Sequence, residues 1–203
     1  MKLNNTSILL VVMLALVSGI TGCDSNEEAT VENPSEPTST PTEPADPKTR
    51  ALAAKAALFE RLSGRLVQAM SNGGPAAAIE VCSKEAASIA SEVGAEQGVR
   101  IGRTSFKLRN TSNRPPEWAE SLVESRTEEA QFLDLPDGHF GAFLPIRIMP
   151  QCLNCHGPVD QIDAEVLARL ESLYPDDQAT GFAIDDLRGW FWIEVPPAES
   201  DGA

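Results

Sequence analysis

The residues with the clearest chemical potential are Cys152-Leu153-Asn154-Cys155-His156. Two thiols separated by two residues can add across the two vinyl groups of one haem, and the adjacent His then lies beneath the iron as an axial ligand. We therefore expect one covalently attached haem c, bonded to Cys152 and Cys155 and ligated by His156.

Two other interpretations of this motif are less favoured. A redox-active Cys-x-x-Cys pair does not require His156, and it normally begins a helix in a thioredoxin-like βαβ unit, which this sequence lacks. A structural zinc site needs four ligands at the usual spacings, and the chain adds only the distant Cys82 to the three residues of the motif.

The second axial ligand is a separate question, because no Met, His or Cys follows His156. A strong ligand must come from upstream, and the candidates are Met70, Cys82, His139 and Met149. Met149 is only three residues before Cys152, and His139 follows Gly138 in an expected turn. Cys82 lies on the apolar stripe of an expected helix, where a free Cys is often a small buried hydrophobe. Spacing alone leaves the choice open.

The elements that must position these residues are predicted from hydrophobic periodicity and turn signals. Leu58, Leu62, Leu66 and Met70 recur at helical spacing before Asn72-Gly73-Gly74, and a second helix from Pro75 carries Cys82 and is expected to stop at Gly94. The order predicts an α+β fold with an antiparallel sheet covered by helices. The expected helices are 50–71, 75–93, 117–132 and 162–174, and the expected strands are 99–106, 138–149 and 180–195.

The chain resembles a family of bacterial and cyanobacterial c-type haem domains with a PAS-like fold, long catalogued as a domain of unknown function. The resemblance covers most of residues 50–195, and the segments that carry it are Ala78-Ile79-Glu80-Val81-Cys82, Gly102-Arg103-Thr104-Ser105 with Lys107 and Arg109-Asn110, the haem motif with Gly157, Tyr174 to Gly181, and Leu187-Arg188-Gly189. It implies a PAS-like antiparallel sheet flanked by helices, with an N-terminal helix. It also implies that Cys82 and His156 are the axial pair.

Three basic residues, Arg103, Lys107 and Arg109, concentrate positive charge in an acidic chain of net charge −14. Because haem propionates are carboxylates, these residues are candidates to pair with them. The alternative is surface charge that balances nearby acids. The net charge also argues against a nucleic-acid partner.

The N-terminal segment reads as a lipoprotein export signal, residues 1–22. Lys2 precedes an apolar run, and Ile20-Thr21-Gly22-Cys23 resembles a lipobox, so Cys23 is expected to carry the lipid; the alternative is a soluble secreted protein. Residues 23–48 predict an acidic, Pro-rich, disordered linker, residues 49–197 the haem domain, and residues 198–203 a disordered tail. We expect a periplasmic location on the bacterial membrane, and Asp24 favours the inner one.

These expectations favour a redox or gas sensor module in which reduction, NO or CO displaces Cys82, acting on a separate protein partner. The alternative is a low-potential monohaem electron carrier, since thiolate ligation favours ferric iron. A peroxidase-like enzyme is the least favoured function because two filled axial positions leave no vacant site, so no enzymatic activity is expected.

Overall fold

The computed structural model describes residues 45–198. The predicted signal peptide, the lipidation site Cys23, nearly all of the acidic linker and most of the tail lie outside these residues. The fold is α+β, as the sequence predicts. Its larger elements are α1 (Pro47–Lys84), α2 (Ala86–Gln97), β1 (Arg100–Thr104), α3 (Glu120–Glu124), β2 (Gln131–Asp134), β3 (Phe140–Arg147), α4 (Leu153–His156), α5 (Ala164–Leu173) and β4 (Leu187–Val195).

The four strands of the described residues form one sheet in the order β1-β4-β3-β2, and every neighbouring pair is antiparallel. The last strand therefore lies between the first and the third, with Gly102 opposite Trp192 and Phe143 opposite Trp192 on the other side. A register shift between Ile146 and Arg147 ends the regular pairing of β3 just before the chain enters the haem motif.

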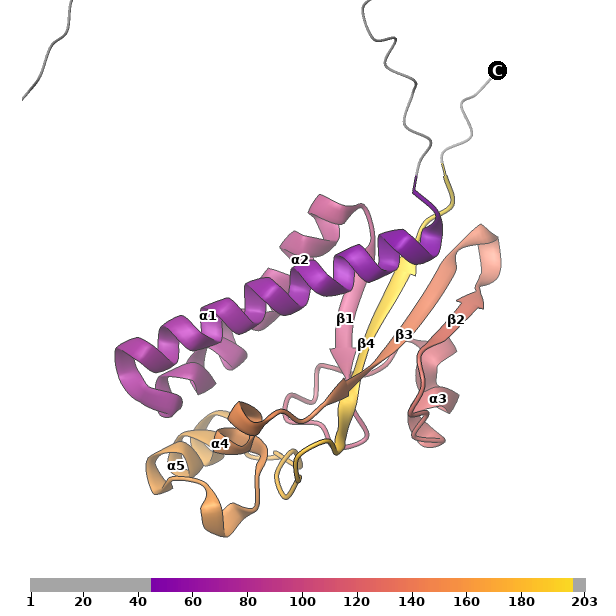
Figure 1. The fold of residues 1–203 in the computed structure, drawn as a ribbon. Helices are drawn as coiled ribbons and strands as arrows, with labels where there is room; N and C mark the ends of the chain where they lie inside the picture. Colours follow the sequence, from indigo (N-terminus) through magenta and orange to yellow (C-terminus); the bar gives the residue numbers. More distant parts are fainter. Residues whose placement is uncertain (1–44, 199–203) are drawn as a thin grey trace, which may run out of the picture. The chain divides into compact units, whose positions relative to one another are not determined.

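The two faces of the sheet are buried against different elements. Because side chains alternate along a strand, Phe191, Ile193 and Val195 of β4 point to one face and Trp190 and Trp192 to the other. The first face packs under α1 and α2, which lie side by side across it (Figure 1). The second face, which includes Phe143 of β3, packs against the short α3 and the residues just before it, and the Trp190 and Phe143 rings stack with their centroids 5.0 Å apart.

Helix α1 consists of two helical segments separated by a kink. Gly73 and Gly74 have non-helical dihedral angles, and Gly74 takes a positive φ of 72°, which a residue with a side chain adopts at a cost. Pro75 then begins the second segment, as the sequence predicts. This segment carries Cys82 and ends at the bend around Glu85. Cys82 therefore lies on just under three turns of helix, between the kink at Gly74 and the irregular turn at Glu85.

The prediction that the helix stops at Gly94 is wrong. The helix α2 continues to Gln97, and Gly98 ends it in the left-handed conformation with a φ of 60°. Gly94 is buried for a packing reason, because a Cβ atom there would lie 2.8 Å from the carbonyl oxygen of Val99. The close approach of the helix to the start of β1 requires this glycine.

Two other predicted elements differ from the structure. The expected helix 117–132 is a single 3-10 turn at Glu117–Ala119 followed by α3, and Arg126 with a φ of 52° ends it. Phe132 lies instead on β2, where it stacks with Phe140. The expected strand 180–195 begins only at Leu187, since the segment before it packs Phe182 against Cys152 and Leu153 of the haem motif.

The haem motif lies beyond the end of β3, with Cys152 in the 3-10 turn Pro150–Cys152 and the other four residues in the short helix α4, and α5 follows it (Figure 1). Helix α5 packs its buried side chains, Val166 and Leu170, against Ala76 and Ile79 of α1. Cys155 is partly buried in the same cluster. One helix thus supports both the segment that carries Cys82 and the motif that carries His156.

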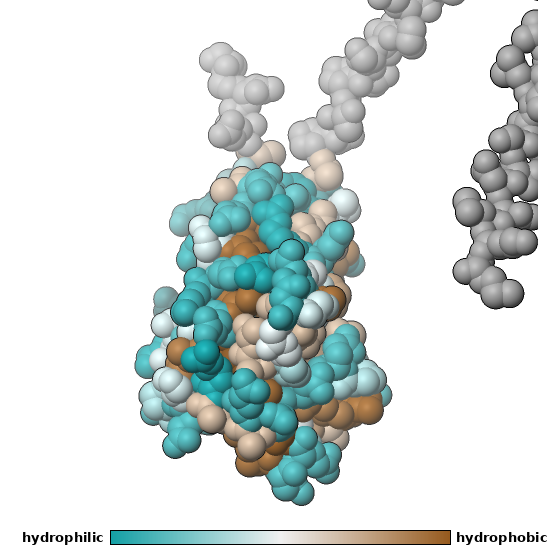
Figure 2. Space-filling model, turned by 90° about the vertical axis from the view of Figure 1, so that its left-hand side faces the viewer, coloured by the Kyte–Doolittle hydropathy of each residue, from teal (hydrophilic) through white to brown (hydrophobic). Residues whose placement is uncertain are grey.

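Within residues 45–198, no helix has the length and apolar character needed to cross a membrane. The face of the molecule in Figure 2 is largely hydrophilic and is interrupted by smaller hydrophobic patches.

Candidate functional site

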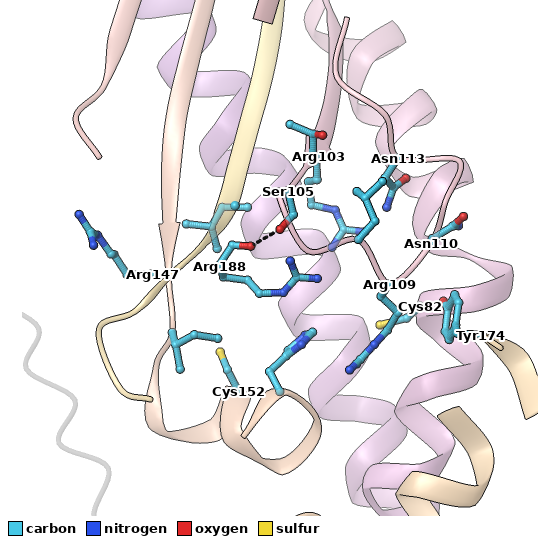
Figure 3. A pocket seen from close by; sticks show the side chains of 16 residues that line it. Cys82, Arg103, Ser105, Arg109, Asn110, Asn113, Arg147, Cys152, Tyr174 and Arg188 are labelled. Atoms are coloured by element: carbon cyan, nitrogen blue, oxygen red, sulfur yellow. Dashed lines mark hydrogen bonds between the residues drawn. The ribbon is translucent and has the colours of Figure 1, made fainter. Parts of the chain in front are cut away.

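One cavity collects most of the residues that the sequence singles out (Figure 3). It lies between α1, the end of β1, the loop that follows β1, the haem motif and the start of β4. Cys82, Cys152 and His156 all line it, as do Arg103, Arg109 and Arg188. The structure therefore brings a thiol from α1 and the motif imidazole, which are far apart in sequence, to the same cavity.

The imidazole of His156 is held by its Nδ1 atom, which lies 2.6 Å from the carbonyl oxygen of Ala179. A carbonyl only accepts, so Nδ1 carries the proton and Nε2 keeps its lone pair. Burial, together with the charges of Arg188 and Arg109, lowers the pKa of His156 well below 6.5. Phe182 contacts the ring edge-on, with the ring centroids 6.3 Å apart. The result is a neutral, oriented imidazole, which is the form that ligates a metal.

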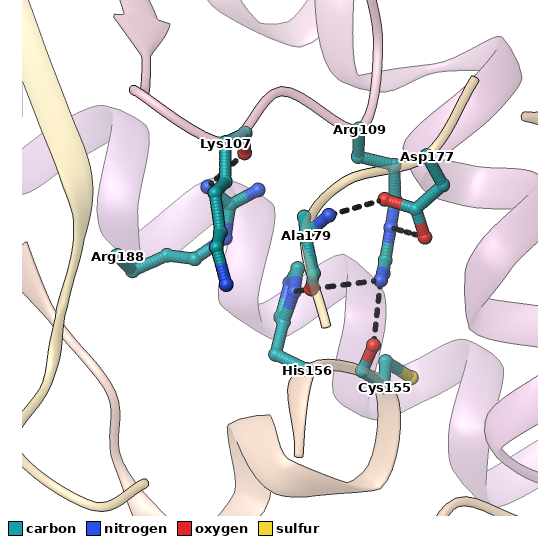
Figure 4. Close-up of polar contacts among 7 residues, drawn as sticks. All are labelled: Lys107, Arg109, Cys155, His156, Asp177, Ala179 and Arg188. Carbon is teal, nitrogen blue, oxygen red and sulfur yellow. Dashed lines mark hydrogen bonds and ion pairs between the residues drawn. The ribbon is translucent and has the colours of Figure 1, made fainter. Parts of the chain in front are cut away.

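Arg109 links the haem motif to the loop that holds His156 (Figure 4). Its Nε donates to Asp177 at 3.0 Å, and its Nη2 donates to the carbonyl oxygens of Cys155 at 2.6 Å and Ala179 at 3.2 Å. The side chains of Arg109 and Asp177 are only 8% and 11% exposed, so the ion pair is shielded from water. Arg109 thus shares the Ala179 oxygen with His156.

Arg103 and Arg188 give the cavity an excess of positive charge. Among the described residues, neither pairs with a carboxylate, whereas Arg109 is neutralised by Asp177. The Nε of Arg188 is buried without a hydrogen-bond partner, and its Nη1 donates to the carbonyl oxygen of Lys107 at 3.1 Å. Burial, reinforced by Arg109 and Arg103, lowers the pKa of Arg188 to about 10. Two guanidinium groups without acidic partners fit a bound group that carries two carboxylates.

Cys82 is half-buried at the wall of this cavity. Burial raises the pKa of its thiol, while the charges of Arg103, Arg109 and Arg188 oppose that shift. The other three candidates for a second axial ligand, Met70, His139 and Met149, do not line the cavity. The placement therefore favours Cys82 among the four.

The geometry does not favour the alternative of a redox-active thiol pair. A redox-active Cys-x-x-Cys pair normally accompanies a thioredoxin-like βαβ unit. The sheet of the described residues is antiparallel throughout and supplies no parallel βαβ unit.

The basic residues predicted to meet the propionates are placed differently from one another. Arg103 and Arg109 line the cavity, whereas Lys107 does not; its Nζ donates to the carbonyl oxygen of Thr180 at 3.3 Å. Arg188 was not among the predicted site residues. A lone Arg at the start of a strand carries no functional signal by itself, and only its place in Leu187-Arg188-Gly189, one of the segments that carry the family resemblance, pointed to it.

The fold and the site together define an α+β domain with a cavity that gathers a thiol, an imidazole and several arginines. The chain belongs to the Tll0287-like family, whose sequence model matches residues 25–196. Among solved structures it is similar to the "cyanobacterial heme-protein Tll0287", with 22% sequence identity and a TM-score of 0.52, over 77% of this chain and 99% of that one. No curated protein matches the chain.

Proposed function

We propose that the cavity holds one haem c, bonded through thioethers to Cys152 and Cys155, with His156 and Cys82 as its axial ligands. One observation carries this proposal. The Nδ1–H of His156 donates to the carbonyl oxygen of Ala179, which leaves Nε2 free to ligate a metal at the same cavity that Cys82 lines. When bound, a haem supplies one-electron chemistry at its iron. Membership of the Tll0287-like family, together with the similarity to a solved structure described as a cyanobacterial haem protein, supports haem as the bound group.

The unpaired charges of the cavity support the same proposal. Arg103 and Arg188 are the best placed residues to receive the two propionates, because Arg109 is already occupied by Asp177 and two carbonyl oxygens. Arg109 instead positions His156 through the shared oxygen of Ala179. In this proposal Cys82 and His156 ligate the iron. Arg103 and Arg188 pair with the propionates, and Arg109 positions His156.

We further propose that the protein is a redox or gas sensor rather than an enzyme. The support is the short helical segment that carries Cys82, which lies between the kink at Gly73 and Gly74 and the bend at Glu85. Release of the thiolate on reduction, or on binding of NO or CO, would free this segment from the cavity. The movement would be read by a separate protein, at a membrane to which lipidation of Cys23 tethers the chain on the periplasmic side.

The second candidate is a low-potential electron carrier. Its specific support is that Val159 and Ile184, shortly after His156 and Phe182, are large apolar side chains with 53% and 52% exposure. Apolar residues exposed near a redox centre, with a strongly acidic net charge around them, suit brief docking to a basic redox partner.

Spectroscopy of the ferric and ferrous protein, with Cys82→Ala beside wild type, tests both the ligand pair and the choice of function. We expect Cys82→Ala to change the ferric absorption and electron paramagnetic resonance spectra, whereas Met149→Leu and His139→Gln leave them unchanged. Loss of the sulfur ligand from wild type on reduction or on addition of CO supports the sensor. Retention of both ligands in both oxidation states, with rapid electron exchange, supports the carrier. Identical wild-type and Cys82→Ala spectra contradict the axial pair.

Covalent attachment has its own test. The haem should stay with the chain after denaturation in acid and organic solvent, and it should be lost from the double variant Cys152→Ala/Cys155→Ala.

A further inference from the structure

A second cavity, of about 180 Å³, adjoins the first on the side of Cys82. Cys82, Arg103, Asn110 and Asn113 line both cavities, so these residues form the wall between them. The other residues of the second cavity come from α2, β1, the loop after β1, and β4: Ala86, Ala87, Ala90, Ile101, Gly102, Ser112, Arg114 and Trp192. A space of this size accommodates several waters or a small polyatomic ion.

The lining is rich in hydrogen-bond donors that have no partner in the protein. Four such groups make no hydrogen bond among the described residues: the guanidinium groups of Arg103 and Arg114, the side-chain amide of Asn113 and the indole N–H of Trp192. The Trp192 ring lies directly over Gly102, where a Cβ atom would come within 2.4 Å of it, so the glycine allows the indole to form part of the wall.

The charge of this cavity is opposite to that of the protein. The chain has 30 acidic and 16 basic residues, yet the lining contains two arginines and no Asp or Glu. Neither Arg103 nor Arg114 forms an ion pair with any described residue. Two guanidinium cations therefore lack a counter-ion, and one of them, Arg103, lies on the wall next to Cys82. A bound anion would stabilise both positive charges.

We propose that this second cavity is a binding site for a small inorganic oxyanion, held by Arg114 and Arg103 with Asn113 and the indole N–H of Trp192 as neutral donors. A guanidinium has five N–H donors, so Arg103 can serve an oxyanion on one side and a carboxylate in the first cavity on the other. Arg114 is exposed and marks the open side of the cavity, so the ion can exchange with solvent.

One consequence rests on the proposed function. Because Cys82 lines both cavities, an anion in the second cavity places negative charge beside the thiolate and disfavours it. The ion should then bind with different affinity to the oxidised and the reduced protein, and by reciprocity it should shift the reduction potential. The site would make the redox behaviour of the protein responsive to an oxyanion in its surroundings.

The binding itself is tested by isothermal titration calorimetry of the ferric holoprotein with inorganic phosphate and with sulfate, at constant ionic strength maintained with sodium chloride. We expect saturable binding of one ion per chain, weakened about tenfold or more in Arg114→Gln. Arg61→Gln is the matched control, because it removes the same charge from α1, where Arg61 pairs with Glu96 outside both cavities, and it should bind as wild type does.

Absence of saturable binding overturns the proposal, and a haem carboxylate that fills the second cavity would give that result. Equal weakening in Arg114→Gln and Arg61→Gln overturns it too, since the effect is then one of net charge. Saturable binding to the ferric protein, and its weakening in Arg114→Gln, can be measured whichever residue ligates the iron. A failure of the Cys82 assignment, seen in the spectra, is therefore separate from a failure of the anion site.

Discussion

The Nδ1 atom of His156 and the carbonyl oxygen of Ala179 lie 2.6 Å apart, and the same oxygen accepts a hydrogen bond from Arg109 at 3.2 Å. A carbonyl that accepts from a cation has less electron density to share with the imidazole N–H. Arg109 therefore limits how strongly His156 donates electron density to a metal on its other nitrogen.

The variant Arg109→Gln tests this relationship. We expect a lower reduction potential, because His156 becomes a stronger donor and one positive charge is lost. We also expect a loss of about 3–5 kcal/mol in the free energy of unfolding, because Asp177, 11% exposed, is left without its partner. Potentiometric titration and chemical denaturation measure the two quantities.

Arg109→Lys separates the hydrogen bond from the charge. It keeps the cation but cannot reproduce the planar fork that reaches Asp177, Cys155 and Ala179 together. A potential that falls in Arg109→Gln but stays at the wild-type value in Arg109→Lys would mean that charge alone is responsible, and the role of the shared oxygen would be wrong.

The pH dependence of the reduction potential distinguishes a thiolate that leaves from one that stays. Burial raises the pKa of the Cys82 thiol above 9, so a sulfur released from the iron takes up a proton throughout the neutral range. Each electron then brings one proton, and the potential falls as the pH rises, by about 59 mV per pH unit for one electron. The sensor proposal predicts this slope between about pH 6 and pH 8, and a flat profile there indicates a carrier that keeps both ligands. Cys82→Ala should remove the slope.

Arg188→Gln should lower the reduction potential, because a buried positive charge that opposes the ferric state is removed. A change on the order of 60 mV corresponds to a tenfold shift in the one-electron equilibrium. Arg169→Gln is the control, since Arg169 is 44% exposed, pairs with Glu80 and does not line the cavity. Equal reduction potentials in the two variants would contradict the placement of Arg188 at the haem site.

The pair Gly189→Ala and Gly181→Ala tests how closely β4 approaches β1 at the cavity. Gly189 has a φ of 156°, and a Cβ there would lie 2.2 Å from the carbonyl oxygen of Thr104. Gly181 has a φ of 78°, and a Cβ added there would meet no atom within 4 Å. We expect a loss of about 1 kcal/mol for Gly181→Ala from backbone strain, and a loss of about 3 kcal/mol or more for Gly189→Ala, read as a larger fall in Tm. Similar losses in both variants would contradict the close approach.

The sequence predicts those parts of the fold that depend on local signals. The break at Gly73 and Gly74 and the restart at Pro75 are visible because turn residues interrupt a helical repeat. The α+β class follows from the alternation of helical and strand patterns. The end of α2 is missed because Gly94 looks like a terminator, although its role is to let the backbone of Val99 approach the helix.

The parts that are missed depend on partners far away in the sequence. Phe132 fits the periodicity of a helix, but its place on β2, opposite Ala142 of β3 and stacked on the ring of Phe140, decides the outcome. In the site, the motif residues are predicted from their spacing alone. No local pattern indicates the role of Arg188 or the sharing of the Ala179 oxygen, because each depends on contacts between residues that are distant in the sequence.

The placement of Cys82 and His156 at one cavity has a consequence for folding. An iron bound by both residues would cross-link two points about 75 residues apart, and a permanent link of that span removes about 4.5 kcal/mol of loop-closure entropy from the unfolded chain. Like a disulfide, this link would open on reduction, but by a one-electron step at the iron and not a two-electron step at sulfur. The oxidised protein would then resist unfolding and proteolysis more strongly than the reduced protein, so that its lifetime, as well as its shape, would follow the redox state of its surroundings.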